Sequence, residues 1–563
     1  MKLSIAFLLG LFLLPLSALA LDVDARILDQ LESGETMNAW VFFEDRSEDL
    51  LLERALDHIS ERALARRAKV LSPDRLLSEM DLPVSAAHQN WLLQRGVEIR
   101  AESRWLNAVS VRLDADGLRV LEEADFIRRV QPVAKSASRR PSSLEPLPWS
   151  LNTREVLEDP IDYGGTEAEI EQINVHLVHQ TGNHGEGVVV GMLDTGFNTN
   201  HEVFQSLTVL GVWDFINDDD VVENEAGDPD GQQNHGTVTL SSLAGYKPGT
   251  HVGVAFGASY YLAKTEDTSQ EVPAEEDFWV EGVEWLEAQG CDVVSSSLGY
   301  DDWYVFEDFD GNTCVTTIAG DYASQLGMAV VNSAGNNRNS TGTMNAPADG
   351  DSVISVGAVN VFGEIASFSS PGPTADGRIK PDICANGVAN HVALPGTWDE
   401  YTDASGTSLS CPLAAGVSAL LISANPTLTP WELREALRET ASQSGSPDND
   451  YGWGIIDAYA ALNHVYATHV DAAPAPRDRL AAWPNPFNPE TTFDFRLEVA
   501  GEIYLSVYDL EGRLVEEIAR GQFEAGDHSI NWKPDGDRIA SGIYLALLKS
   551  DRGTAISKVA LVK

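Results

Sequence analysis

The sequence has few cysteines and few basic residues for its length. It contains 4 cysteines in 563 residues, and 38 lysines and arginines against 86 aspartates and glutamates, so the formal net charge is −48. A surface this acidic repels a phosphate backbone, which excludes nucleic acid as a partner. The cysteines lack the C-x-x-C spacing of a metal site, and the zinc-peptidase motif His-Glu-x-x-His is missing. A metal-dependent peptidase is therefore disfavoured.

Long apolar runs are missing beyond the N-terminus. A membrane span needs about 18 or more apolar residues, and no later segment has them. Residues 1–20 instead have the pattern of a bacterial signal peptide. Lys2 supplies the positive end, Ile5–Leu16 is the apolar run, and Ala18-Leu19-Ala20 is a small-x-small cleavage site. We expect export with cleavage after Ala20, and hence a secreted, extracellular or cell-surface protein.

Export allows disulfide bonds, so the state of the cysteines is open. They are Cys291, Cys314, Cys384 and Cys411. Cys291 opens an apolar strand and Cys411 lies in a helix of small residues, positions that suit buried free thiols equally well. Spacing alone does not establish bridge geometry, so both alternatives stand.

The chain is too long for one hydrophobic core, and three or four domains are expected. Two Pro- and Ser- or Ala-rich stretches act as linkers. The resulting division is a signal peptide at 1–20, a first region at 21–133, a linker at 134–160, a large region at 161–466, a linker at 467–482 and a last region at 483–563.

The first region predicts a ferredoxin-like α+β fold. Strand patterns occur at 39–43, 97–100, 108–112 and 126–130, and helical patterns at 48–70 and 118–124. The order is β-α-β-β-α-β, with extra helix inserted.

The large region predicts a three-layer α/β fold. Apolar runs at 187–193, 291–298, 328–332 and 353–356 alternate with helical stretches such as 275–289. Continuous apolar strands alternating with helices indicate a parallel sheet that is covered on both faces. The last region has short alternating runs between turn signals, which predict an all-β, Ig-like sandwich of about 80 residues.

Four motifs of the large region carry chemistry. Asp194 ends an apolar strand, where open α/β sheets place their sites. His235 stands in Asn-His-Gly-Thr at a helix start, Asn336 follows another strand, and Ser408 begins a helix of small residues. Singly, each has an ordinary explanation as a turn, a structural histidine or a helix cap. Together they supply the nucleophile, proton acceptor, orienting carboxylate and oxyanion donor of serine acyl transfer.

These segments resemble the signature segments of the subtilisin-like serine proteases, the subtilases. The resemblance covers about residues 161–464, and the Gly406-Thr-Ser-Leu-Ser-Cys-Pro412 string is its most specific part. It implies a secreted endopeptidase in which Ser408 is the nucleophile, His235 the general base and acid, and Asp194 the group that orients His235. It also implies that Asn336 donates to the oxyanion.

The same resemblance implies how a protein or peptide substrate binds. Ser297-Leu298-Gly299 is similar to the family's substrate-binding strand, whose backbone pairs with an extended peptide. Two positions depart from the family pattern, Val238 and Leu413, where many relatives carry histidine. Neither position belongs to the expected catalytic group.

The flanking regions carry resemblances of their own. The first region is similar to the family's inhibitory prosegment, so it is expected to act as an intramolecular inhibitor, with the linker at 134–160 as the processing zone. The last region, with Trp483-Pro-Asn-Pro-Phe-Asn-Pro489 and Ser541-Gly-Ile-Tyr544, resembles C-terminal sorting domains of type IX secretion. The secretion machinery is thus an expected partner, and a generic adhesive sandwich is the alternative.

No cofactor is expected for catalysis, while structural calcium is an open expectation. Acidic loops at 214–230 and 308–312 offer the oxygen ligands that calcium prefers. Neither matches a defined ligand spacing, so solvated loops are the alternative and the metal ligands stay unknown.

Two other functions fit the sequence less well. An α/β-hydrolase esterase needs a Gly-x-Ser-x-Gly elbow and the order Ser, acid, His, and Ser408 has neither. A surface-binding protein with an inactive protease-like domain would be expected to lack part of the triad, which is complete here.

Overall fold

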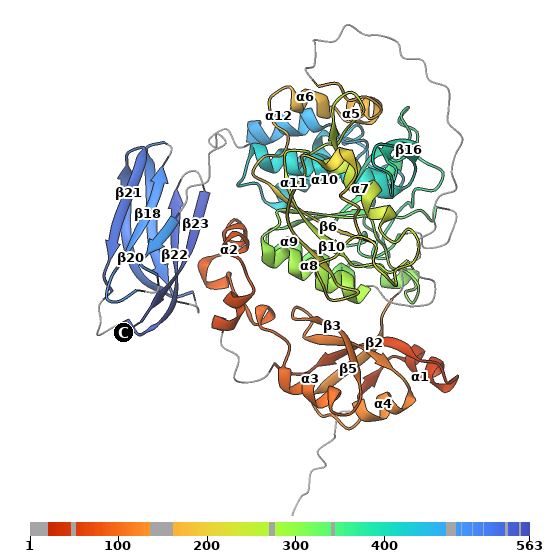
Figure 1. Ribbon diagram of the computed structural model, residues 1–563, viewed down its shortest axis with the longest axis horizontal. Coiled ribbons are helices and arrows are strands. Elements are labelled where there is room, and N and C mark those ends of the chain that lie inside the picture. The colour runs from red at the N-terminus through yellow and green to blue at the C-terminus, as the bar shows by residue number, and fades with distance from the viewer. Residues whose placement is uncertain are drawn as a thin grey trace, which may run out of the picture.

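The computed structural model describes residues 21–46, 52–134, 161–268, 276–338, 344–468, 480–485, 487–497, 499–509, 512–534, 539–550 and 553–562. These residues form three bodies, which we call the N-terminal module (21–134), the central domain (161–468) and the sandwich (480–562) (Figure 1). The expected signal peptide, nearly all of the first expected linker and most of the second lie outside the described residues.

A seven-stranded parallel sheet forms the middle of the central domain. Its order is β14-β13-β12-β11-β6-β10-β7, and every neighbouring pair is parallel. The strands are β6 (Val189–Asp194), β7 (Thr208–Asp214), β10 (Ser259–Lys264), β11 (Val293–Ser296), β12 (Ala329–Ser333), β13 (Ile354–Val359) and β14 (Ile383–Asn386). The expectation of a buried parallel sheet is confirmed.

Helices cover both faces of this sheet. In β6, Val190 and Met192 point into the cluster that contains α7 and α10, whereas Val189 and Leu193 point into the cluster that contains α8 and α9. The first pair of helices is α7 (Asn234–Ala244) and α10 (Thr407–Ala424), and the second is α8 (Glu276–Gln289) and α9 (Val315–Gln325). The short helices α5 (Glu167–Gln172) and α6 (Val175–His179) and the helices α11 (Pro430–Thr440) and α12 (Ala458–Thr468) complete the first face.

Helix α10 is long and apolar enough to cross a membrane by length and composition alone. Within the described residues it is the one helix with this property, and 94% of its apolar window is buried inside the protein. Its small side chains let it pack against β11, β12, β13 and β14. It is therefore the core helix of the central domain.

The N-terminal module has a five-stranded sheet of order β1-β5-β2-β4-β3. Without the edge strand β1 this is the ferredoxin-like order. The elements are β1 (Asp22–Val23), α1 (Ala25–Glu32), β2 (Met37–Phe43), α3 (Ala86–Leu93), β3 (Glu98–Ser103), β4 (Ala108–Leu113), α4 (Ala115–Leu121) and β5 (Ile127–Pro132).

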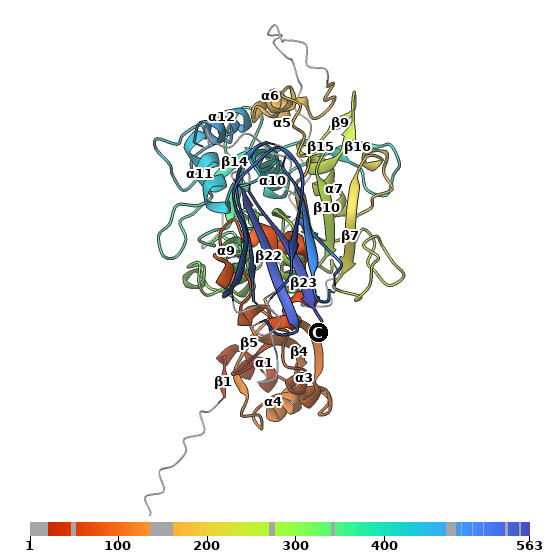
Figure 2. The same ribbon diagram turned by 90° about the vertical axis from the view of Figure 1, so that its left-hand side faces the viewer.

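The crossover helix of this module is α3, and not the stretch 48–70 that its charged, leucine-rich pattern suggested. That stretch belongs to an insert, residues 52–81, which contains α2 (Glu61–Arg67) and short 3₁₀ turns. The insert leaves the ferredoxin-like core and packs between the central domain and the sandwich (Figures 1 and 2). Part of the stretch is helical as predicted, but its α-helix spans only Glu61–Arg67, and its place in the fold was predicted wrongly.

The C-terminal region is a sandwich of a three-stranded and a four-stranded antiparallel sheet. The first is β17 (Leu480–Trp483), β18 (Thr491–Leu497) and β21 (Gly526–Trp532), and the second is β20 (Leu514–Phe523), β19 (Gly501–Tyr508), β22 (Gly542–Ser550) and β23 (Gly553–Leu561). Apolar side chains of both sheets meet in one core, as the alternating pattern predicts.

Candidate active site

Asp194 and His235 are in direct contact. The Oδ1 atom of Asp194, the last residue of β6, lies 2.6 Å from Nδ1 of His235 and also accepts a hydrogen bond from the backbone N–H of Thr195 at 2.7 Å. Its second oxygen accepts from the hydroxyl of Thr239 at 2.9 Å. The carboxylate is 1% exposed, so it is shielded from water. The hydrogen bonds from Thr195 and Thr239 hold it in place. This arrangement fixes the plane and the tautomer of the imidazole ring.

A glycine allows α7 to approach β6 closely enough for this contact. A Cβ atom on Gly236 would lie 2.1 Å from the carbonyl oxygen of Gly196 and 3.0 Å from Cβ of Asp194. Any side chain at this position would push the helix, and His235 with it, away from the carboxylate.

Ser408 lies in the first turn of α10, where the helix dipole and free backbone N–H groups favour negative charge. Its hydroxyl donates to the carbonyl oxygen of Ser297 at 3.3 Å, and the hydroxyl of Ser297 donates to the carbonyl oxygen of Ser408 at 2.9 Å. Because β11 lies beside β6, this pair joins the helix start to the strand-end edge that carries Asp194. Ser408 is 8% exposed.

Asn336 follows β12 on the same edge of the sheet. Its Oδ1 atom accepts hydrogen bonds from the backbone N–H and the hydroxyl of Thr407, at 3.0 and 3.1 Å. With its oxygen engaged in this way, the amide turns its NH2 group away from Thr407. Gly335 before it has a φ of +103°, and a Cβ atom there would lie 2.1 Å from Oδ1 of Asn345, so this turn requires glycine.

The segment Ser297–Gly299 continues β11 past the end of its ladder. The side-chain amide of Asn332 donates to the carbonyl oxygen of Leu298 at 3.0 Å. A Cβ atom on Gly299 would lie 2.0 Å from the amide nitrogen of Asn345, so the backbone here runs tightly against the protein. The segment is therefore held in place on its inner side.

The sequence patterns did not identify two threonines of this site. Thr239 and Thr407 hold the side chains of Asp194 and Asn336, yet neither stood out as a functional residue. The available signals were their positions: Thr239 lies one helical turn after His235, and Thr407 directly precedes Ser408.

The acidic loop after β7 brings several carboxylates together, but a lysine side chain already neutralises part of their charge. Asp214, Asp219 and Glu225 place oxygens within 4.8 Å of one another. The buried ammonium of Lys264, however, lies 2.7 Å from Asp214 and 2.8 Å from Asp228. Positive charge is thus already supplied there. In the part of the chain that the structure describes, the loop 308–312 forms no such group, so calcium stays a prediction.

All four cysteines are buried free thiols. Burial raises the pKa of each thiol, to about 12 for Cys411. Cys411 also donates to the carbonyl oxygen of Ser296 at 3.3 Å. Of the two alternatives that the sequence left open, the structure has free thiols.

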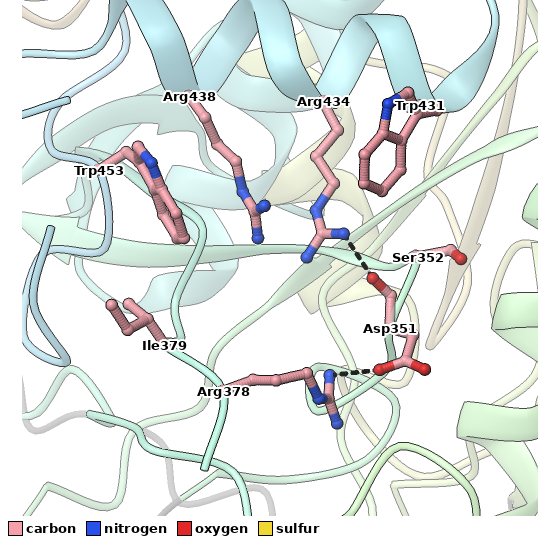
Figure 3. A pocket seen from close by; sticks show the side chains of 8 residues that line it. All are labelled: Asp351, Ser352, Arg378, Ile379, Trp431, Arg434, Arg438 and Trp453. Atoms are coloured by element: carbon pink, nitrogen blue, oxygen red, sulfur yellow. Dashed lines mark hydrogen bonds and ion pairs between the residues drawn. The ribbon is translucent and has the colours of Figure 1, made fainter. Parts of the chain in front are cut away.

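A cavity of about 480 Å³ lies elsewhere in the central domain (Figure 3). Its walls are Asp351, Ser352, Arg378, Ile379, Trp431, Arg434, Arg438 and Trp453. Arg434 and Arg438 both bind Asp382, and Arg378 binds Asp351 at 3.0 Å. None of the candidate catalytic residues reaches this cavity, and its arginines bind neighbouring carboxylates.

Aspartate, histidine and serine at one edge of a parallel sheet are typical of serine hydrolases. The family model described as the Subtilase family matches residues 185–454. The Peptidase S8 propeptide domain of Bacteroidota matches residues 38–145, and the Secretion system C-terminal sorting domain matches residues 481–562.

Individual relatives agree with these matches. Subtilisin of Bacillus pumilus is 33% identical over 296 residues, 52% of this chain and 97% of its own length. Subtilisin E of Bacillus subtilis is 29% identical over 381 residues, 67% of this chain and 86% of its own. Fervidolysin from Fervidobacterium pennivorans shares the fold, with a TM-score of 0.56 at 20% identity over 91% of this chain and 70% of its own.

The chain belongs to the subtilase family. It is a subtilisin-like serine endopeptidase with a propeptide domain, which is the N-terminal module, and a C-terminal secretion sorting domain, which is the sandwich. The sorting domain places it outside the cell or at the cell surface.

Proposed function

We propose that the endopeptidase works through a triad of Ser408, His235 and Asp194. The hydroxyl oxygen of Ser408 attacks the peptide carbonyl carbon while His235 takes the hydroxyl proton. The tetrahedral oxyanion accepts hydrogen bonds from the amide of Asn336 and the backbone N–H of Ser408. His235 then gives the proton to the leaving amine, and water hydrolyses the resulting acyl-enzyme by the reverse proton transfers.

The contact between His235 and Asp194 carries this proposal. A 2.6 Å separation to a carboxylate that is 1% exposed orients the ring and stabilises the imidazolium that forms during attack. The helix start beneath Ser408 favours the negative charge that develops nearby. The segment Ser297–Gly299 is held on its inner side and is proposed to pair with an extended peptide through its backbone.

The decisive experiment compares the parent precursor with Ser408→Ala. The parent is expected to process itself and to hydrolyse casein, and the variant to do neither, with a loss of about 10⁶-fold in kcat. Ser410→Ala is a matched control, because Ser410 is buried two residues further along α10 and its hydroxyl has no hydrogen-bond partner among the described residues. This control should keep parental activity. A processed but inert parent would instead favour a surface-binding protein.

We further propose that the N-terminal module inhibits the enzyme until cleavage within residues 134–160, and that the sandwich addresses it to secretion machinery. The module covers α8 and α9 of the central domain, and a buried cluster joins them. Deleting residues 483–563 and following the protein in cell and medium fractions tests the second part. Unchanged export of the shortened chain contradicts it.

A further inference from the structure

Strand β22 of the sandwich is apolar on both faces. Tyr544, Ala546 and Leu548 point into the core of the sandwich. Leu545 and Leu547 point the other way, yet they are only 3% and 8% exposed. The outer face of an antiparallel sheet in water normally carries polar residues. An apolar outer face in a buried state indicates that another part of the molecule covers it.

The apolar outer face extends to both neighbouring strands. Ile556 of β23 lies directly opposite Leu547, and Tyr508 of β19 lies directly opposite Leu545. Residues opposite one another in an antiparallel pair share a face. We call Tyr508, Ile543, Leu545, Leu547 and Ile556 the outer row.

The insert of the N-terminal module covers the outer row. One buried cluster joins the outer row to the insert residues Ala55, Leu56, Ile59, Ala63, Leu64, Leu76 and Leu77. Helix α2 packs against β23 and lies between the sandwich and the central domain (Figures 1 and 2). The contact joins segments that are more than 400 positions apart in the sequence.

A hairpin turn of the sandwich touches the same insert. Gly512 has a φ of +72°, and a Cβ atom there would lie 1.9 Å from Cα of Asp74. The turn therefore approaches the insert more closely than any side chain at this position allows. Asparagine is among the side chains that best tolerate the left-handed conformation of Gly512, so it would add the clash with Asp74 at a small cost in backbone strain.

The insert is in turn fastened to the central domain. Arg66 and Arg67 pair with the buried carboxylate of Glu287 on α8, and Arg62 pairs with Asp292. One face of the insert is thus polar and bound to the enzyme, and another is apolar and bound to the sandwich.

We propose that the insert is the docking element that holds the sorting domain against the precursor through the outer row. Removal of the N-terminal module then uncovers the outer row, so maturation also changes the surface that the sorting domain presents. The docking itself is independent of catalysis, and only its release rests on the proposed peptidase function.

Thiol labelling tests this docking, because all four native thiols are completely buried. The reporter is Leu547→Cys in the full-length Ser408→Ala precursor, labelled with a maleimide. Val499→Cys, at a position that is 58% exposed, sets the fast limit, and Val507→Cys, in the sandwich core, sets the slow limit. We expect Leu547→Cys to react at least about tenfold more slowly than Val499→Cys, because opening of the interface limits the reaction.

Adding Gly512→Asn should separate the sandwich from the insert and raise the labelling rate of Leu547→Cys toward that of Val499→Cys. The matched control is Gly34→Asn, another left-handed glycine, whose Cβ atom would have open space around it and which should leave the rate unchanged. Fast labelling without Gly512→Asn overturns the proposal, and so does slow labelling that persists with it. Adding active parent enzyme to cut the reporter precursor in trans tests the release separately. Failure of that cleavage counts against the peptidase function and leaves the docking result intact.

Discussion

The guanidinium group of Arg67 lies 2.7 Å from the carboxylate of Glu287, and neither side chain is exposed to solvent. The pair joins the insert of the N-terminal module to α8 of the central domain. Burial alone would raise the pKa of Glu287, but the charges of Arg67 and Arg66 lower it to about 2. Arg67 also binds Asp81 at 2.8 Å, so two arginines and two carboxylates balance inside the interface.

We expect Arg67→Ala to destabilise the precursor by about 3–5 kcal/mol, because it leaves Glu287 buried without its main partner. Urea denaturation of the Ser408→Ala precursor with and without Arg67→Ala measures this. Asp116→Asn is the control, since it removes the exposed pair with Arg119 in the same module and should change stability by about 1 kcal/mol or less. Equal effects of the two substitutions contradict a structural role for the buried pair.

Two other carboxyl groups of α8 make the same interface sensitive to pH. Burial raises the pKa of Glu276 and of Glu284 to about 7. The N-terminal module contacts both groups and its hydrogen bonds oppose part of the shift: the indole N–H of Trp40 donates to Glu276 at 3.1 Å, and the backbone N–H of Trp105 donates to Glu284 at 3.2 Å. Arg104 lies 3.3 Å from Glu284 and opposes part of the shift.

The sign of the pH effect follows from the raised pKa. Above pH 7 the folded precursor holds Glu284 ionised in a buried position, and this costs stability. Below the ordinary pKa of 4.5 the group is protonated in both folded and unfolded chains, and the cost vanishes. The contribution of Glu284 to the free energy of unfolding therefore becomes more favourable as the pH falls from 8 to 5. Glu287 acts in the opposite sense, but only below about pH 4.5.

Glu284→Gln isolates this effect, because glutamine stays neutral at every pH. The difference in unfolding free energy between parent and variant should change by about 3 kcal/mol between pH 5 and pH 8, in favour of the variant at pH 8. Guanidinium titrations of the two Ser408→Ala precursors across this range provide the measurement. Glu123→Gln, at an exposed position of the N-terminal module, should give a pH profile parallel to that of the parent. A parallel profile for Glu284→Gln would sink the prediction.

Local patterns were enough to name the strand-end and helix-start candidates of the site. Asp194 ends β6 and Asn336 follows β12, and parallel strands bring their carboxyl ends to one edge of a sheet. The sequence therefore placed both residues at the carboxyl-end edge of the sheet, whereas the contact of Asp194 with His235 is visible only in the structure. Thr239 and Thr407 were missed because a threonine near a helix start has many ordinary uses, and only its partner distinguishes it.

The place of the insert could not be predicted from local patterns. Arg66 and Arg67 stand on a charged helix and would normally be solvated. Their burial depends on Glu287, which is more than 200 positions away. Strand β20, at an edge of the sandwich, is difficult to recognise from local patterns for a simpler reason: half of its residues are exposed, so its alternation is weak.

The hydrogen bonds from Thr407 to Asn336 predict a graded loss of activity. Asn336→Ala should lower kcat about 10²–10³-fold with little change in KM, because an oxyanion donor acts mainly in the transition state. Thr407→Val should lower kcat less, by freeing the Asn336 amide to rotate, and Thr407→Ser should restore most of it. Steady-state kinetics on a peptide anilide separate the two constants. A change confined to KM would place Asn336 in substrate binding instead.

The donors around Asp194 lead to the last prediction. Asp194→Asn should lower kcat about 10⁴-fold, because an amide favours the wrong tautomer of His235 and cannot stabilise the imidazolium. Thr239→Val removes one hydrogen bond to the same carboxylate and should lower kcat about tenfold to a hundredfold. Thr239→Ser keeps the hydroxyl and should recover the parental rate. If Thr239→Val lowered thermal stability while kcat stayed parental, Thr239 would be only a packing residue of α7, and Asp194 would owe its orientation to Thr195 and His235 alone.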